Sequence, residues 1–354
     1  MISNIIKAII KNSLNIPATP GFITFFVTWA CNARCVFCDI WKKRAADRET
    51  MSVDEIGRIF EQMKTVDVVR ITGGEPFLRN DIVEIIERID DFSAPGMIHI
   101  STNGLLTERI LRDMKTVRPI HKIHIKISVD AVGEEHDRLR GVPGAYDKAM
   151  ATVRGLVGLR GERAFHVGIN QAIVDKRGIE AYRQLKEMMR PLGVPVYPSI
   201  AFDPANSLYS DKGMVDPALS FKPLGQFTAA ELESFMRSVL ADAKEVGDFK
   251  ERLVDRYHLR GLYNRLVKGR PFPRPRCVAL SNHLRILPNG DVPVCLYNGK
   301  IVGNLRSQKL KDIWFGDTLK KEREWVRKCP GCWQSCESAV SAIYTGDIVR
   351  GLFC

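Results

Sequence analysis

Apolar and polar residues follow two alternating patterns between about Phe22 and Phe202. Short runs rich in β-branched and aromatic residues predict six strands: Phe22–Thr28, Val68–Thr72, Met97–Ser101, Lys122–Val129, Phe165–Val174 and Val194–Phe202. Between them, apolar residues recur at helical spacing and predict helices at Val53–Met63, Asp81–Ile89, Glu108–Met114, Tyr146–Leu159 and Ile179–Met189. Ser52 and Glu55 form a capping-box pattern before the first of these helices. Strands alternating with helices predict an α/β fold with a parallel sheet, either open or closed into a barrel.

The pattern changes on both sides of this region. Residues 203–226 are rich in Pro, Gly, Ser and Asp and predict a long loop that acts as a lid, and 228–268 is mostly helical. The amphipathic pattern of Met1–Leu14 predicts a helix that packs on its own domain or lies on a membrane surface. The expected division is an N-terminal extension, a core, a helical and Pro-rich connection and a C-terminal domain, at residues 1–21, 22–202, 203–276 and 277–354.

Composition narrows the class of protein. With 354 residues, 45% hydrophobic and 27% charged, the chain is an ordinary globular sequence and not a disordered one. No apolar run reaches the 18 residues that a membrane-spanning helix needs. The nine cysteines gather near the two ends, which is atypical of a disulfide scaffold and typical of metal sites in a reducing cytoplasm.

The basic residues are concentrated in one stretch. The net charge is +12, and residues 250–328 alone contain 19 Lys and Arg against 7 Asp and Glu, a difference of 12. Such a stretch favours phosphate, nucleic acid, acidic protein or anionic lipid as a partner, or is simply a solvated surface. Because no aromatic-plus-basic RNA-reading motif accompanies it, we do not expect nucleic acid to be the partner.

A group of three cysteines follows the first predicted strand. Cys31, Cys35 and Cys38 are spaced C-x3-C-x2-C, and no histidine lies in this loop to complete a zinc site. Three thiolates on an iron–sulfur cluster leave one iron open to another ligand, as a catalytic cluster requires. We therefore favour an iron–sulfur cluster over zinc at this loop.

Polar and glycine-rich segments end the next strands. They are Gly73-Gly74-Glu75-Pro76, Ser101-Thr102-Asn103-Gly104 and Ser128-Val129-Asp130, followed by Arg140-Gly141 and, within the fifth strand, Asn170. Because active sites of parallel α/β folds gather at the carboxyl ends of strands, we expect these segments to meet the cysteine loop. Each also has a structural interpretation, such as a turn, a helix cap or a surface ion pair.

Taken together, these motifs resemble the radical S-adenosylmethionine (radical SAM) superfamily over residues 22–202. The resemblance implies a partial (β/α)6 parallel barrel in which Cys31, Cys35 and Cys38 hold a [4Fe-4S] cluster that binds S-adenosylmethionine (SAM). It implies that the GGEP segment meets the methionine amino group, that Ser128 and Asp130 lie near the ribose, and that Arg140 pairs with the SAM carboxylate. The SAM contacts implied are Gly73, Gly74, Glu75, Pro76, Thr102, Asn103, Ser128, Asp130, Arg140 and Asn170.

The C-terminal cysteines extend the resemblance. Cys277 and Cys295, with Asn289-Gly290 between them in a predicted hairpin, resemble the opening of a small SPASM/twitch domain, and Cys329-x2-Cys332 resembles its return half. This implies at least one auxiliary [4Fe-4S] cluster. The full SPASM spacing is not kept after Cys332, so Cys336 is an alternative ligand and Cys354 a spare thiol. Two clusters with three cysteines each, or structural zinc, remain alternatives.

The resemblance implies an enzyme that cleaves SAM reductively to a 5′-deoxyadenosyl radical and removes a hydrogen atom from its substrate. The substrate is a small metabolite, a lipid-linked or phosphorylated molecule, or a peptide, and a flavodoxin or ferredoxin supplies the electron. We expect a cytoplasmic protein with peripheral membrane contact as an option, and we assign no catalytic acid or base. The alternatives are a non-catalytic iron–sulfur or zinc protein that binds nucleic acid, and a maturation factor that carries clusters.

Overall fold

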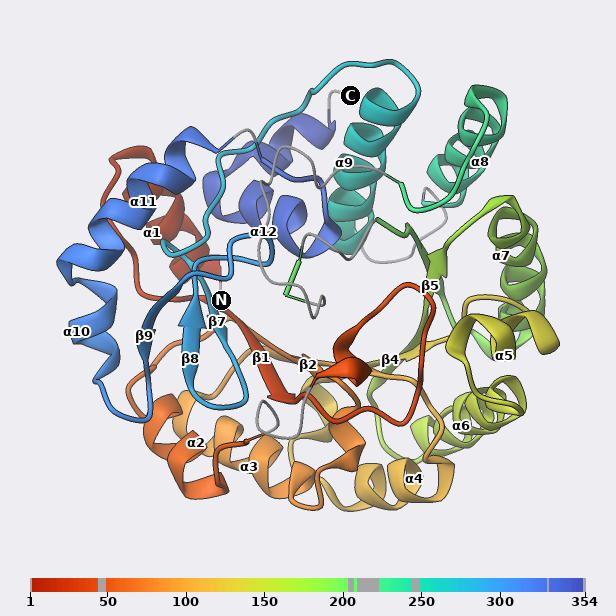
Figure 1. The fold of residues 1–354 in the computed structure, drawn as a ribbon, viewed down its shortest axis with the longest axis horizontal. Coiled ribbons are helices and arrows are strands. Elements are labelled where there is room, and N and C mark those ends of the chain that lie inside the picture. Colours follow the sequence, from red (N-terminus) through yellow and green to blue (C-terminus); the bar gives the residue numbers. More distant parts are fainter. Residues whose placement is uncertain are drawn as a thin grey trace.

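The structure is a computed structural model that describes residues 2–43, 49–202, 207–208, 223–243, 249–329 and 331–352. Seven strands form one parallel sheet in the order β6-β5-β4-β3-β2-β1-β7. In Figure 1 they curve around the centre of the molecule, with helices α2, α3, α4, α6 and α7 in an arc outside them. The first six strands are β1 (Phe22–Thr28), β2 (Val68–Gly73), β3 (Met97–Thr102), β4 (Ile123–Ser128), β5 (His166–Ile173) and β6 (Val196–Ile200). This confirms the expected α/β parallel barrel.

The helices between these strands also begin and end near the predicted residues. They are α2 (Val53–Phe60), α3 (Ile82–Ser93), α4 (Thr107–Thr116), α5 (Glu134–Arg140), α6 (Ala145–Arg160) and α7 (Lys176–Met189). Ser52 and Glu55 make both hydrogen bonds of the predicted capping box. The short α5 was not predicted.

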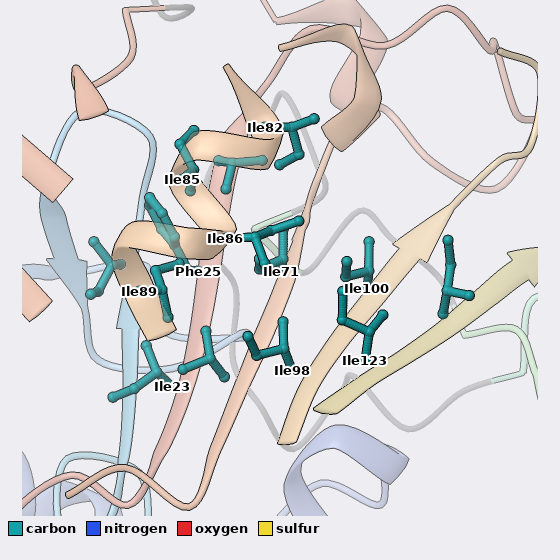
Figure 2. Packing of buried hydrophobic residues seen from close by; sticks show 14 of the residues in the cluster. Ile23, Phe25, Ile71, Ile82, Ile85, Ile86, Ile89, Ile98, Ile100 and Ile123 are labelled. Carbon is teal, nitrogen blue, oxygen red and sulfur yellow. The ribbon is translucent and has the colours of Figure 1, made fainter. Parts of the chain in front are cut away.

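Buried isoleucines pack the outer helices against the sheet. On α3, Ile82, Ile85, Ile86 and Ile89 recur every three or four residues and are buried against β1 to β3, as Figure 2 shows. The strands supply every second residue to this contact, for instance Ile98 and Ile100 of β3. The residues between them point the other way, into the barrel.

The C-terminal part does not fold as a separate layer. Its strand β7 (His283–Ile286) pairs in parallel with β1 and becomes the seventh strand of the sheet. The predicted hairpin around Asn289-Gly290 is therefore only partly right, because β8 (Asp291–Pro293) pairs with β9 (Ile301–Asn304) and not with β7. The turn itself is present, with Gly290 at a φ of 88°.

Helices complete the rest of the described chain. They are α1 (Ile2–Ser13), α8 (Ala229–Asp242), α9 (Phe249–Leu266), α10 (Leu310–Trp314), α11 (Asp317–Lys328) and α12 (Ser335–Thr345). The inner face of α1 packs on α12, where Asn12 donates hydrogen bonds to Asn282 and to the carbonyl of Tyr344. Within the ranges that the structure describes, no helix is both long and apolar enough to cross a membrane. The predicted lid falls almost wholly on residues outside those ranges.

Candidate functional site

One large cavity opens at the carboxyl ends of the strands. Its volume is about 1080 Å³, and it extends down the inner face of the barrel. The three cysteines of the first loop line it. So do eight of the residues expected to contact SAM or to flank those contacts: Gly73, Gly74, Ser101, Thr102, Asn103, Ser128, Asp130 and Asn170. Arg140 lines it as well, whereas Glu75 and Pro76 are not among its described lining residues.

The cysteine loop is held by its neighbours on both sides. The backbone amide of Arg34 donates to the carbonyl of Arg140, and the amide of Val36 donates to the carbonyl of Leu139, so the loop follows the end of α5. Burial raises the pKa of Cys31 to about 11 and that of Cys38 to about 12. The free thiols are therefore protonated near neutral pH and would release their protons when they bind iron as thiolates.

The Gly-Gly pair is required by the close approach of β1. A Cβ on Gly74 would lie 2.0 Å from the carbonyl oxygen of Ala30, and one on Gly73 would lie 2.3 Å from that of Thr28. The amide of Gly74 donates to the Thr28 carbonyl at 2.7 Å, and the amide of Glu75 donates to Ala30 at 2.8 Å. These bonds fix the start of the cysteine loop against the end of β2.

The carboxylate of Glu75 is turned into the protein. It accepts hydrogen bonds from the Thr102 hydroxyl at 2.7 Å, from the Asn103 amide at 2.7 Å and from the Phe77 amide at 3.1 Å. Burial raises its pKa to about 7, against the effect of these donors. Glu75 thus joins the ends of β2 and β3. The side-chain amide of Asn103 in turn donates a hydrogen bond to Oδ1 of Asn32 in the cysteine loop, at 2.7 Å.

Asp130 and Arg140 form a buried ion pair beside the cysteine loop. The Arg140 guanidinium contacts both carboxylate oxygens, at 2.7 and 2.9 Å, and its third nitrogen lies 3.6 Å from the sulfur of Cys35. The amide of Ala172 on β5 also donates to Asp130, at 2.9 Å. Sequence reasoning placed both residues at this site, but it did not foresee that they would pair with each other.

The C-terminal cysteines gather near the end of β8. Cys277 and Cys295 pack against the main hydrophobic core, and both lie near Cys329, since a charge on Cys329 raises the pKa of each. Burial raises the pKa of Cys277 to about 11. Cys332 is described as well, at the start of the next described range, 331–352, whereas the side chain of Cys336 and all of Cys354 lie outside the description.

The donor sets fit iron–sulfur clusters. Three thiols line one cavity beside glycines that allow close backbone approach, and thiolate-only donor sets are typical of clusters. Within the described ranges, no three His, Cys, Asp or Glu side chains are arranged to share a single metal ion.

Comparison with known proteins gives the same assignment. A family model described as the radical SAM superfamily matches residues 26–171, and one described as the SPASM iron-sulfur cluster-binding domain matches residues 277–337. The chain is a radical SAM enzyme with a SPASM domain. These domains imply SAM, a [4Fe-4S] cluster that binds it, and auxiliary iron–sulfur clusters.

The relatives of this radical SAM enzyme have different activities. An AdoMet-dependent heme synthase of Methanosarcina barkeri is 26% identical over 94% of the chain and 95% of the relative. A probable GTP 3′,8-cyclase of Saccharolobus islandicus is 26% identical over 77% and 81%. The crystal structure of Streptococcus suis SuiB bound to S-adenosylmethionine aligns with a TM-score of 0.60 at 18% identity, over 87% of this chain and 68% of that one. The last similarity supports the fold alone.

Sequence reasoning missed the inner wall of the barrel. Arg70, His99 and Lys126 line the cavity below the strand ends, yet their strands were interpreted only as apolar runs. The signal was present as strict alternation: in Met97–Thr102 and Ile123–Ser128, isoleucine alternates with His, Ser or Lys. Alternation indicates a strand with one apolar and one polar face, so these strands face helices on one side and a polar interior on the other.

Proposed function

We propose that this enzyme binds its first [4Fe-4S] cluster through Cys31, Cys35 and Cys38 and holds SAM in the adjoining cavity. One observation carries the proposal: the three thiols, the Gly73-Gly74 pair and the Thr102-Asn103 segment line a single cavity. When bound and reduced, the cluster and SAM supply a 5′-deoxyadenosyl radical that removes a hydrogen atom from the substrate. The chain's own residues bind and orient SAM and the substrate, and they exclude water from the cavity.

The residues of the site divide into two groups. Gly73, Gly74, Thr102, Asn103, Ser128 and Asn170 line the cavity and are assigned to SAM contact. Glu75 and Asp130 accept hydrogen bonds from neighbouring strand ends, and Arg140 is paired with Asp130, so we assign these three to positioning. Pro76 begins the short helix after Glu75 and belongs with them. Positioning by buried groups that are paired within the protein keeps the cofactor geometry fixed during the reaction.

An auxiliary cluster on Cys277, Cys295, Cys329 and Cys332 completes the proposal, with Cys336 as the alternative ligand. The proximity of the first three thiols supports their sharing one cluster. This cluster either accepts an electron from the substrate radical or positions the substrate. A flavodoxin or ferredoxin is the proposed electron donor to the enzyme.

The size of the cavity supports a small-molecule substrate beside SAM. Its volume of about 1080 Å³ is slightly larger than the usual range for ligand pockets, about 300–1,000 Å³, so a cofactor and a compact substrate fit together. The two relatives reported above take their names from heme and GTP, which are compact and anionic. A peptide is the second substrate class, and a lipid-linked molecule the third.

Anaerobic assay of 5′-deoxyadenosine tests the proposal. The reconstituted enzyme is given SAM and a strong reductant, beside a Cys31/Cys35/Cys38→Ala triple variant. We expect 5′-deoxyadenosine from the wild type alone, and a loss of about four irons in the variant. If the wild type held zinc and formed no 5′-deoxyadenosine, the proposal would fall, and salt-dependent nucleic-acid binding or cluster transfer to a partner would be tested next.

The outer face of α1 supports peripheral membrane contact. Ile6 and Ile10 lie one above the other on α1, and Leu14 follows directly after its last residue. These three are 52%, 54% and 63% exposed, with Lys7 and Lys11 exposed between them. Apolar residues flanked by lysines suit an anionic lipid surface. We expect an Ile6→Ser/Ile10→Ser/Leu14→Ser variant to lose sedimentation with phosphatidylglycerol vesicles. Equal sedimentation of variant and wild type would exclude this contact.

A further inference from the structure

A row of side chains crosses the barrel below the SAM site. The sheet register aligns Arg285 of β7, Thr24 of β1, Arg70 of β2 and His99 of β3 side by side. Arg70 precedes Gly73 by three residues, which at about 3.3 Å per residue places it about 10 Å below the strand end. This row therefore lies deeper in the barrel than the residues assigned to SAM.

One half of this row is paired with neighbouring side chains. Arg285 forms an ion pair with the buried carboxylate of Glu337, and the Thr24 hydroxyl lies 2.8 Å from Nε2 of His283. The charge of Arg285 is therefore neutralised from within the chain, although its Nη1 is buried without a hydrogen bond among the described residues. This ion pair also shows that the fold can supply an acid to a buried arginine in this row.

The other half has no such partners. In the part of the chain that the structure describes, Arg70 makes no side-chain hydrogen bond or ion pair, and its Nε is buried and unbonded. Its guanidinium lies over the ring of Phe22, 5.3 Å from the centroid, which orients the group without neutralising it. Nδ1 of His99 is likewise buried and unbonded. Buried polar atoms of this kind normally have a partner, so their position on a cavity wall points to a ligand.

The charge of the wall selects the sign of that ligand. Among the described lining residues, five are Lys or Arg and three are Asp. Asp130 pairs with Arg140 and Asp242 with Lys186, which leaves one acid on the wall, Asp255, against three basic residues, Arg70, Lys126 and Arg190. Burial, and then the charges of Arg70 and Lys126, keep the pKa of His99 well below its usual value. The imidazole is therefore neutral near pH 7, and Nδ1 can present an N–H.

From this geometry we infer that Arg70 and His99 form a subsite for an anionic group of the substrate, a carboxylate or a phosphate, with Lys126 adding positive charge. The inference rests on the proposed function, because it places the substrate below SAM in the same cavity. A guanidinium offers paired N–H donors that match either anion. Positive charge at this depth would disfavour a cationic or wholly apolar substrate.

The experiment measures anion binding to the full-length, cluster-loaded enzyme by calorimetry in the absence of reductant. The probes are inorganic pyrophosphate and GTP as phosphate sources, and citrate and heme as carboxylate sources. At least one probe should bind the wild type, and Arg70→Gln should weaken that binding at least tenfold. His99→Leu should weaken it about threefold to tenfold, whereas His99→Asn, which keeps a donor near Nδ1, should weaken it less.

Matched variants separate this site from general charge effects. Arg237→Gln removes an arginine whose side chain is 68% exposed on α8 and should change the dissociation constant less than twofold. Arg70→Lys keeps the charge without the paired donors and should fall between the wild type and Arg70→Gln. It also serves as the test if Arg70→Gln fails to fold. Tighter binding of pyrophosphate and GTP identifies a phosphate site, and tighter binding of citrate and heme a carboxylate site.

The same preparations are assayed for 5′-deoxyadenosine, so that two failures can be told apart. If no probe binds, or if Arg70→Gln and Arg237→Gln bind equally well, the subsite is overturned while SAM cleavage still supports the proposed function. If the anion binds through Arg70 but the wild type forms no 5′-deoxyadenosine, the proposed function falls and the anion site stands.

Discussion

The rim and the floor of the barrel use charged residues in opposite ways. At the rim, Glu75 accepts three hydrogen bonds from the ends of β2 and β3, and Asp130 and Arg140 neutralise each other. On the floor, Arg70 and His99 carry unbonded buried nitrogens on the cavity wall. The charges of the rim are thus paired within the protein, although Nε of Arg140 and Oδ2 of Asp130 make no hydrogen bond, whereas Arg70 on the floor has no acidic partner among the described residues.

This difference suits the two kinds of molecule that we assign to the cavity. A cofactor that is the same in every turnover benefits from a site whose charged residues are locked by the protein itself. A substrate is held more specifically when it supplies the missing partner, because a molecule without the right group leaves buried donors unpaired. Loss of a rim charge should therefore lower the free energy of unfolding, and loss of a floor charge should weaken substrate binding.

The largest expected effect is at the rim ion pair. Arg140→Met leaves Asp130 buried without its partner, and breaking a buried pair from one side costs about 3–5 kcal/mol. We expect a loss of this size in the free energy of unfolding of the cluster-free protein, measured by denaturant titration. The Asp130→Asn/Arg140→Met double variant should recover part of it, because no lone charge stays buried. A loss below about 1 kcal/mol in the single variant would show that the rim does not depend on this pair.

The next effect concerns the glycines that bring β1 and β2 together. Gly74→Ala places a methyl group 2.0 Å from a backbone oxygen, so the cysteine loop must move. We expect about 1–3 kcal/mol of lost stability and a lower iron content after reconstitution. Gly158→Ala is the matched control, since nothing lies within 4 Å of its Cβ on α6, and it should be neutral or stabilising by up to about 1 kcal/mol. Equal iron content in the two variants would contradict this account.

A third effect depends on pH through Glu75. Burial raises its pKa to about 7 in the folded chain, from the ordinary value of 4.5, so the folded state binds the extra proton between these values. Its contribution to stability is present below pH 4.5 and is lost as the pH rises through 7. We expect the free energy of unfolding of the cluster-free wild type, relative to Glu75→Gln, to fall between pH 5 and pH 8.

Glu75→Gln is the reference for this series because other buried groups titrate in the same window. Buried His258, for example, has a pKa lowered to about 4, which adds stability as the pH rises through 6.5. Subtracting the Glu75→Gln curve removes such contributions. A difference that stays flat from pH 5 to pH 8 would mean that Glu75 is ionised throughout.

The sequence predicted the rim well because its signals are local. Strand boundaries, the Ser52 capping box and the cysteine spacing each depend on residues a few positions apart, and β1 was predicted to the residue. The assembly of Cys31, Gly73 and Asn103 in one cavity then followed from the rule that parallel strands present their carboxyl ends at one edge.

What the sequence did not predict depends on contacts between distant segments. To predict the Asp130–Arg140 pair, one would need to know how the end of α5 packs against the cysteine loop. The parallel pairing of β7 with β1 joins residues more than 250 positions apart, and the local Asn289-Gly290 turn suggested a simple hairpin instead. The floor was missed for a different reason: Arg70 and His99 were counted within apolar runs, although their alternation with isoleucine and valine marked an inner polar face.

The smallest expected effect on the free energy of unfolding is that of a substitution on the floor, and it tests the contrast with Arg140 at the rim. Arg70→Gln removes the charge of a half-buried residue that has no acidic partner in the described chain, so no other charge is left unpaired. Only its stacking on Phe22 is lost, and such a contact is worth about 0.5–1 kcal/mol. We expect the free energy of unfolding of the cluster-free Arg70→Gln variant to change by less than about 1 kcal/mol, measured beside Arg140→Met under the same conditions. A loss as large as that of Arg140→Met would show that Arg70 has a structural role, and the rim and floor would then no longer differ in the way proposed.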